Sequence, residues 1–178
     1  QISTGKKENK FGVNKNTFYE IISYCKKSPN IDLKCLSVHI GSQILDHRPY
    51  QKMLKAVSQI LKKTNHKFEF IDLGGGMGIS YSDNNKKLNY KKYNLAILRF
   101  LSEHKVKIIF EPGRSIIGNT GTLVTKVIYI KDSGRKKFII LDAAMNDLMR
   151  PALYGAFHKT LAVTKSDKKS KEPYEFVG

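Results

Sequence analysis

The chain has 178 residues, of which 40% are apolar, and this composition argues against a disordered chain and predicts a globular protein with a core of its own. Its 32 Lys and Arg residues against 15 Asp and Glu residues give a formal charge of +17, which by itself suggests a polyanionic partner such as nucleic acid. The lysines are spread along the whole chain without a nucleic-acid motif, so solvated surface lysines are favoured and no nucleic-acid partner is expected.

Before Gly118, apolar residues alternate between helical and strand spacing. The expected helices begin at Thr17, at Tyr50 and around Leu95, and the first of them stops at Ser28-Pro29-Asn30. The expected strands cover residues 33–40, 68–73 and 106–110. The polar stretch from Asp83 to Lys92 is interpreted as a surface loop. Repeated strand and helix patterns of this kind predict a (β/α) barrel.

After Gly118 the pattern changes. Residues 122–130 and 138–141 are expected to be two strands joined by a turn at Asp132-Ser133-Gly134, with no helix between them. The apolar stretch Tyr174-Glu175-Phe176-Val177-Gly178 also has the pattern of a strand. We therefore expect an α/β chain in which residues 1–118 form part of a (β/α) barrel and residues 119–178 begin a β-rich domain.

The two cysteines and the hydropathy indicate no special chemistry. Cys25 and Cys35 form neither a CxxC pair nor a metal-ligand spacing, and both are interpreted as small helix or strand residues. The sequence contains no signal peptide and no apolar run long enough to cross a membrane. We expect a cytoplasmic protein without a metal or a membrane partner.

Polar residues and glycines follow each of the three strands expected before Gly118. His39 and Ser42 follow the first strand, Gly74-Gly75-Gly76 the second, and Glu111 with Arg114 the third. In a barrel these strand ends share one rim, so the residues are candidates for a single site. Each also has a structural interpretation: a buried histidine bonded to a carbonyl, a tight glycine turn, and an ion pair between the glutamate and the arginine.

The chemistry of these residues suits a phosphate and a ring nitrogen. Glycine amides approach a phosphate with no side chain in the way, a carboxylate at the rim can accept a proton from a ring nitrogen, and an arginine can bind a carboxylate or phosphate with two hydrogen bonds. Further along, Arg150 and Tyr154 are four residues apart around Pro151 and would face one way on a helical turn. They remain open to interpretation as a surface cation and a core aromatic.

Taken together, these segments closely resemble the diaminopimelate decarboxylase family. The opening Ile2-Ser3-Thr4-Gly5 with Lys10-Phe11-Gly12 is similar to that family as well. The segments that carry the resemblance are His39-Ile40-Gly41-Ser42-Gln43, Asp72-Leu73-Gly74-Gly75-Gly76, Glu111-Pro112-Gly113-Arg114-Ser115 and the stretch from Asp142 to Tyr154.

The resemblance implies a fold-type III decarboxylase that uses pyridoxal 5'-phosphate, with an alanine-racemase-like (β/α)8 TIM barrel and a β-domain. It implies a lyase that converts meso-2,6-diaminopimelate to L-lysine and CO2, the last step of lysine biosynthesis. Such enzymes are usually homodimers whose active sites are shared between the subunits.

The resemblance also implies a role for each candidate residue. His39 would stack on the cofactor ring, and Glu111 would keep the ring nitrogen protonated. The glycines Gly74, Gly75 and Gly76, together with Ser42 and the backbone around Gly113 and Arg114, would hold the phosphate. The residues expected to contact the substrate are Arg114, Arg150 and Tyr154.

Two expected parts of this family's site lie elsewhere. The Schiff-base lysine is upstream in relatives, and a Cys-Glu motif follows a Val-Gly such as Val177-Gly178. We therefore expect an internal fragment that is inactive by itself. The alternatives are an ornithine, arginine or carboxynorspermidine decarboxylase of the same fold, and a non-catalytic relative.

Overall fold

The computed structural model describes residues 11–81, 86–164 and 172–178. The chain divides into two compact units, of which the first spans residues 1–80 and 85–120 and the second spans 81–84 and 121–178. Ile2-Ser3-Thr4-Gly5 and Lys10, which contribute to the family resemblance, lie outside the described residues.

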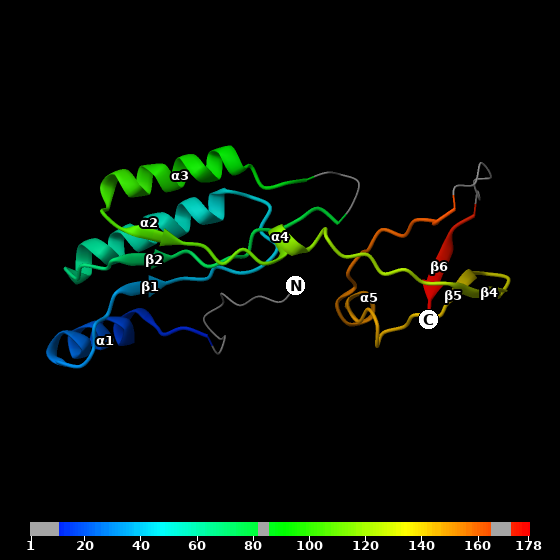
Figure 1. Cartoon of the computed structure of the whole chain (residues 1–178), viewed down its shortest axis with the longest axis horizontal. Coiled ribbons are helices and arrows are strands. Elements are labelled where there is room, and N and C mark those ends of the chain that lie inside the picture. The colour runs from blue at the N-terminus through cyan, green and yellow to red at the C-terminus, as the bar shows by residue number, and fades with distance from the viewer. Residues whose placement is uncertain (1–10, 82–85, 165–171) are drawn as a thin grey trace. The chain divides into compact units, whose positions relative to one another are not determined.

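The first unit alternates helices with parallel strands (Figure 1). Its sheet has the order β1-β2-β3, with Leu36, Ile71 and Ile108 side by side in register. In chain order the elements are α1 (Lys15–Lys27), β1 (Cys35–Ser37), α2 (Arg48–Thr64), β2 (Phe70–Asp72), α3 (Tyr90–Glu103), β3 (Lys107–Ile109) and α4 (Arg114–Ile117). The predicted α/β class is confirmed, although each strand is shorter than its apolar run.

Local signals explain where the helices begin and end. The Asn14 side chain accepts hydrogen bonds from the amides of Asn16 and Thr17, so α1 begins two residues before the expected Thr17. The helix α2 has a proline in its first turn and ends at Asn65, which adopts the left-handed conformation at φ 44°. Both cysteines lie in regular elements as expected, Cys25 in α1 and Cys35 in β1.

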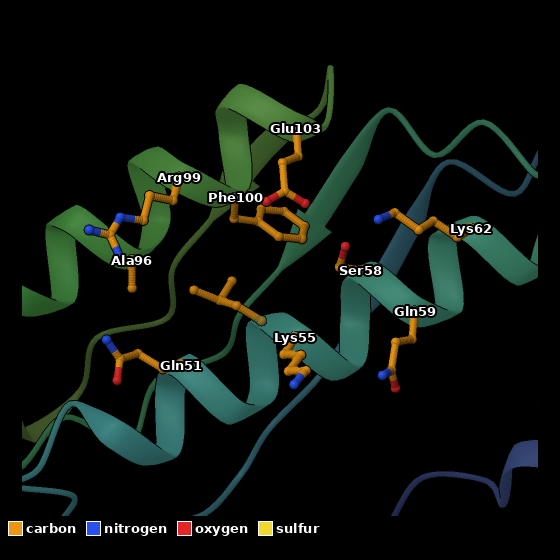
Figure 2. A pocket seen from close by; sticks show the side chains of 10 residues that line it. Gln51, Lys55, Ser58, Gln59, Lys62, Ala96, Arg99, Phe100 and Glu103 are labelled. Carbon is orange, nitrogen blue, oxygen red and sulfur yellow. The ribbon is translucent and has the colours of Figure 1, made fainter.

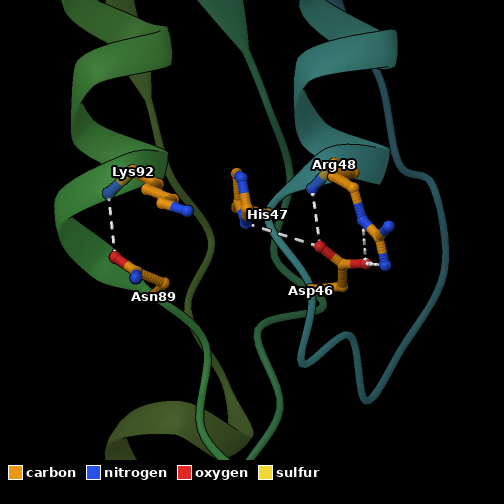
Figure 3. A network of polar contacts seen from close by, with 5 residues as sticks. All are labelled: Asp46, His47, Arg48, Asn89 and Lys92. Atoms are coloured by element: carbon orange, nitrogen blue, oxygen red, sulfur yellow. Dashed lines mark hydrogen bonds and ion pairs between the residues drawn. The ribbon is translucent and has the colours of Figure 1, made fainter.

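The surface loop expected up to Lys92 is wrong at its end, because α3 begins at Tyr90. The side chain of Asn89 accepts a hydrogen bond of 3.0 Å from the amide of Lys92 and caps the helix (Figure 3). Leu88, just before the cap, is only 4% exposed and belongs to the core. The polar first turn of α3 faces solvent, and this is why its sequence has the composition of a loop.

The core of the first unit lies between the sheet and the helices α2 and α3, which pack side by side (Figure 1). Tyr50 of α2 is completely buried, and its ring lies 4.6 Å from that of Tyr93 of α3, centroid to centroid. Burial raises the pKa of Tyr50, and it raises the pKa of Tyr93 to about 12. The two hydroxyl groups are therefore neutral donors at physiological pH.

The second unit holds a separate sheet of order β4-β5-β6. Its elements are β4 (Val127–Asp132), β5 (Lys137–Leu141), α5 (Arg150–Tyr154) and β6 (Tyr174–Val177). β4 and β5 form the expected antiparallel hairpin, and β6 pairs with β5 in parallel. The hairpin turn and the final strand are confirmed, whereas β4 begins at Val127 and not at Thr122 as predicted.

Within the described residues, no helix combines the length and the apolar character needed to cross a membrane.

Candidate functional site

The segments that follow β1, β2 and β3 meet at one edge of the first unit because the three strands are parallel. Backbone hydrogen bonds continue the pairing beyond the strands. Val38 donates to the carbonyl of Asp72 at 2.9 Å, and Glu111 donates to the carbonyl of Gly74 at 3.0 Å. His39, the glycine turn and Glu111 therefore lie in adjacent segments.

The three glycines of the turn Gly74–Gly76 are required by close backbone approach. Gly74 and Gly76 have φ of 63° and 83°, which L residues rarely adopt. A Cβ on Gly74 would lie 2.9 Å from Nδ1 of His39, and a Cβ on Gly75 would overlap the carbonyl of Glu111. The tight-turn interpretation is thus correct, and it also places the turn directly between the histidine and the glutamate.

The hydrogen bonds of this turn leave two amides available. Its carbonyl oxygens accept from the Glu111 amide, from the Tyr50 hydroxyl at 3.2 Å and from the Ile44 amide at 2.9 Å. Among the described residues, the amides of Gly75 and Gly76 have no acceptor. Adjacent amide donors at the end of a strand form a binding site for an anion such as phosphate.

Asp72, which the sequence analysis did not assign to the site, fixes the start of the turn. Its side chain accepts from the amide of Gly74 at 2.8 Å and from the hydroxyl of Ser37 at 2.9 Å. The residue is only 9% exposed, so both bonds hold a carboxylate that is largely withdrawn from water. Its position at the end of an apolar strand and just before the glycines is the sequence signal that could have identified it.

His39 and Ser42 are both exposed, on the segment that follows β1. The alternative of a buried histidine bonded to a carbonyl is therefore wrong. Within the described part of the chain, the His39 ring makes no hydrogen bond, and its Nδ1 lies beside Gly74. The imidazole is consequently accessible to a ligand held at the glycine turn.

Glu111 and Arg114 do not form the ion pair that the sequence left open. No salt bridge between described residues joins them, and Arg114 instead donates from Nη1 to Oε1 of Gln43 at 3.1 Å. Glu111 is exposed and its carboxylate has no partner among the described residues. Gly113 is exposed and precedes the short helix α4.

Arg150 and Tyr154 begin and end the helix α5 of the second unit, as their spacing predicted. The Arg150 guanidinium lies over the ring of Tyr81, 5.6 Å from its centroid, and the same ring meets His158 edge-on. Nε of Arg150 and Nε2 of His158 are buried and have no hydrogen-bond partner in the described part of the chain. Arg150 is half-buried and Tyr154 is 49% exposed, so neither the surface-cation nor the core-aromatic alternative holds.

Asp142, which opens the long segment that ends at Tyr154, anchors that segment to the hairpin. Its carboxylate accepts from the Thr125 hydroxyl at 2.5 Å and from the Lys126 amide at 2.8 Å. These bonds hold the pKa of Asp142 below its usual range, and the bond from Thr125 makes the largest contribution.

A shallow groove of about 430 Å³ runs between α2 and α3 (Figure 2). Phe100 of α3 points into the space between the helices, and Ser58 and Glu103 lie at its sides. None of the predicted site residues lines it. The groove is a feature of the helix surface and not of the strand ends.

The strand ends lie in the part of the chain that matches a known protein family. The family described as "Pyridoxal-dependent decarboxylase, pyridoxal binding domain" matches residues 1–118, which is more than half of the chain. The chain belongs to this family. The matched segment contains the glycine turn, His39, Glu111 and Arg114, so all of these residues fall within the pyridoxal-binding domain.

Individual members of the family are similar over nearly the whole chain. The diaminopimelate decarboxylase of Aquifex aeolicus is 39% identical over 171 residues, which cover 94% of this chain and 41% of that protein. The Helicobacter pylori enzyme is 40% identical over 180 residues, covering 99% of this chain and 44% of the relative. The crystal structure of diaminopimelate decarboxylase from Helicobacter pylori complexed with L-lysine superposes with a TM-score of 0.86 at 40% identity. It covers 99% of this chain and 44% of that one. The chain therefore spans about two-fifths of the length of these relatives.

Proposed function

We propose that the protein that contains this chain is a diaminopimelate decarboxylase, which releases CO2 from meso-2,6-diaminopimelate and forms L-lysine with pyridoxal 5'-phosphate as cofactor. The observation that carries the proposal is the pair of available amides at Gly75 and Gly76, flanked by His39 and Glu111 at one edge of the sheet. The similarity to named diaminopimelate decarboxylases, at 39–41% identity for several of them, supports this substrate over related ones.

The residues present fit the phosphate of the cofactor. The backbone of Gly74–Gly76 leaves no room for a Cβ, and two of its amides have no acceptor among the described residues. Adjacent to it, the exposed hydroxyl of Ser42 and the backbone around Gly113 and Arg114 complete the set of proposed phosphate contacts. Amide donors of this kind hold a dianion without bringing a titratable group into the site.

Glu111 and His39 are proposed to act on the ring of the cofactor. When bound, pyridoxal phosphate supplies a ring that accepts the electron pair left by the departing CO2. The Glu111 carboxylate has no partner among the described side chains and would hold a proton on the ring nitrogen, while the exposed imidazole of His39 would pack against the ring. Both residues thereby tune and orient the group that performs the chemistry.

Arg114, Arg150 and Tyr154 are proposed to bind the substrate. Diaminopimelate has two carboxylates, and a guanidinium binds a carboxylate with two parallel hydrogen bonds. The Arg150 Nε is buried without a hydrogen-bond partner among the described residues, and this favours a ligand as its acceptor, since an unsatisfied buried donor costs free energy. The exposed hydroxyphenyl ring of Tyr154 is available for a further contact.

We further propose that residues 1–118 are part of an alanine-racemase-like (β/α)8 TIM barrel and that residues 119–178 begin a β-domain. The alternation of helices with a parallel sheet and the superposition on the Helicobacter pylori structure support this assignment. The homodimer with shared active sites, the lack of a nucleic-acid partner and the cytoplasmic location stay predictions.

The test is to express the protein from its complete gene and to follow the release of lysine and CO2 from meso-diaminopimelate with added pyridoxal phosphate. We expect turnover by the wild type and at least about a hundredfold loss for Glu111→Gln, which no longer holds charge opposite the ring nitrogen. Turnover of ornithine, arginine or carboxynorspermidine alone would assign the protein to a related decarboxylase. Cofactor binding without any turnover would indicate a non-catalytic relative.

A further inference from the structure

The side chain of Gln43 joins the three segments that follow the parallel strands. Its Nε2 donates to the carbonyl of Ile79 at 2.5 Å, and its Oε1 accepts from the amide of Ile79 at 3.3 Å. The same oxygen accepts from Nη1 of Arg114 at 3.1 Å. One amide group thus connects the segment after β1 to the segment after β2 and to the first residue of α4.

The surrounding backbone is arranged for this side chain. Gln43 adopts φ 61°, a left-handed conformation that residues other than glycine rarely keep unless neighbouring contacts hold them there. A Cβ on Gly78 would lie 3.0 Å from Oε1 of Gln43, and a Cβ on Gly118 would lie 3.0 Å from Cγ of Arg114. The absence of side chains at these two glycines leaves the space that Gln43 and the stem of Arg114 occupy.

We infer that Gln43 is a positioning residue, which orients the guanidinium of Arg114 to receive a carboxylate of the substrate. This inference rests on the proposed function. A glutamine oxygen fixes one of the five N–H donors of an arginine without cancelling its positive charge, whereas a carboxylate at the same place would neutralise it. Because Nε2 and Oε1 are both bonded to Ile79, the amide cannot turn away and its oxygen stays aimed at Arg114.

The experiment uses the complete protein with its cofactor and two probes, meso-diaminopimelate for turnover and heptanedioate for binding. Heptanedioate has the same carboxylate spacing but no amino group, so its dissociation constant is measured by calorimetry without reaction. Gln43→Asn tolerates the left-handed backbone but withdraws the amide by one methylene. Gln59→Asn makes the same change on the exposed face of α2 and is the matched control.

We expect Gln43→Asn to raise KM and the heptanedioate dissociation constant about tenfold, with kcat changed much less, because a bond to a charged group is lost. In an Arg114→Ala background the same substitution should have no further effect on binding. Gln43→Glu should also weaken heptanedioate binding, because its carboxylate neutralises the charge of Arg114. It also loses the donor that bonds the Ile79 carbonyl, so its melting temperature should fall as well.

Equal effects of Gln43→Asn with and without Arg114 would overturn the inference, since Gln43 would then act through loop structure alone. Behaviour identical to Gln59→Asn, or a wild type that does not bind heptanedioate, would overturn it too. A wild type that binds heptanedioate but does not decarboxylate diaminopimelate would refute the proposed function, while the coupling between Gln43 and Arg114 would still be measured by calorimetry.

Discussion

Replacement of Asp72 should loosen the glycine turn by a predictable amount. The carboxylate accepts one hydrogen bond from the Gly74 amide and one from the Ser37 hydroxyl, and the residue is only 9% exposed. Hydrogen bonds to a charged acceptor contribute about 1.5–3 kcal/mol each. Ser37 is exposed, so its hydroxyl can bond to water once the bond to Asp72 is lost. The contribution of this bond should therefore be about 1.5 kcal/mol or less. We expect Asp72→Ala to cost about 3 kcal/mol.

Two further variants separate the contributions of the two bonds. In Asp72→Asn the amide oxygen can still accept from Gly74, while its NH2 group donates to the Ser37 hydroxyl, which is able to accept. This variant should therefore cost only about 1 kcal/mol. Ser37→Ala removes one bond and leaves the Gly74 bond intact, so it should cost about 1 kcal/mol as well.

Native-state hydrogen exchange of the amides in residues 73–78 is the appropriate assay, because the opening of this turn is local and a large protein rarely unfolds in two states. The free energy of opening should be highest in the wild type and lowest in Asp72→Ala. The two single variants Ser37→Ala and Asp72→Asn should have similar, intermediate values. An Asp72→Asn variant as damaging as Asp72→Ala would refute the reasoning, because it would show that the negative charge and not the hydrogen-bond geometry maintains the turn.

Three other substitutions test the neighbouring contacts. Tyr50→Phe removes the hydroxyl that donates to the Gly75 carbonyl and should cost about 1–2 kcal/mol in the same exchange measurement, whereas no change would mean that this bond of 3.2 Å is without effect. Gly75→Ala places a Cβ on the Glu111 carbonyl, so it should weaken the binding of pyridoxal phosphate at least about tenfold, as measured by fluorescence titration. The control Gly121→Ala places its Cβ in open space and should leave this affinity unchanged. Hydrogen bonds from Arg48 lower the pKa of Asp46 to about 2 (Figure 3), so its ionised form favours the folded state. The stabilisation by ionised Asp46 should be complete above about pH 4 and be lost as the pH falls toward 2. Asp46→Asn should abolish this part of the pH dependence of stability. A carbon-13 NMR titration in which the Asp46 carboxyl has its usual pKa would contradict the prediction.

The sequence alone predicted the class of the chain and the order of its longer helices and strands, because helical and strand periodicities are local. It did not predict the short helix α4. The hairpin at Asp132-Ser133-Gly134 and the helical turn from Arg150 to Tyr154 depend on neighbours within a few residues, and both are present. The polar start of α3 was wrongly predicted to be a loop for the same reason: a solvent-facing helical turn and a loop have the same composition.

Sequence motifs also led to the decarboxylase family, since the four segments that resemble it are each recognisable from consecutive residues. What the motifs could not show is how these residues contact one another. Gln43 meets Arg114 across 71 positions, Ser37 meets Asp72 across 35, and Tyr50 meets Gly75 across 25. The exposure of His39 and the separation of Glu111 from Arg114 depend equally on such contacts. Only the packing of three parallel strands brings these segments to one edge, and no local periodicity encodes which side chains then face each other.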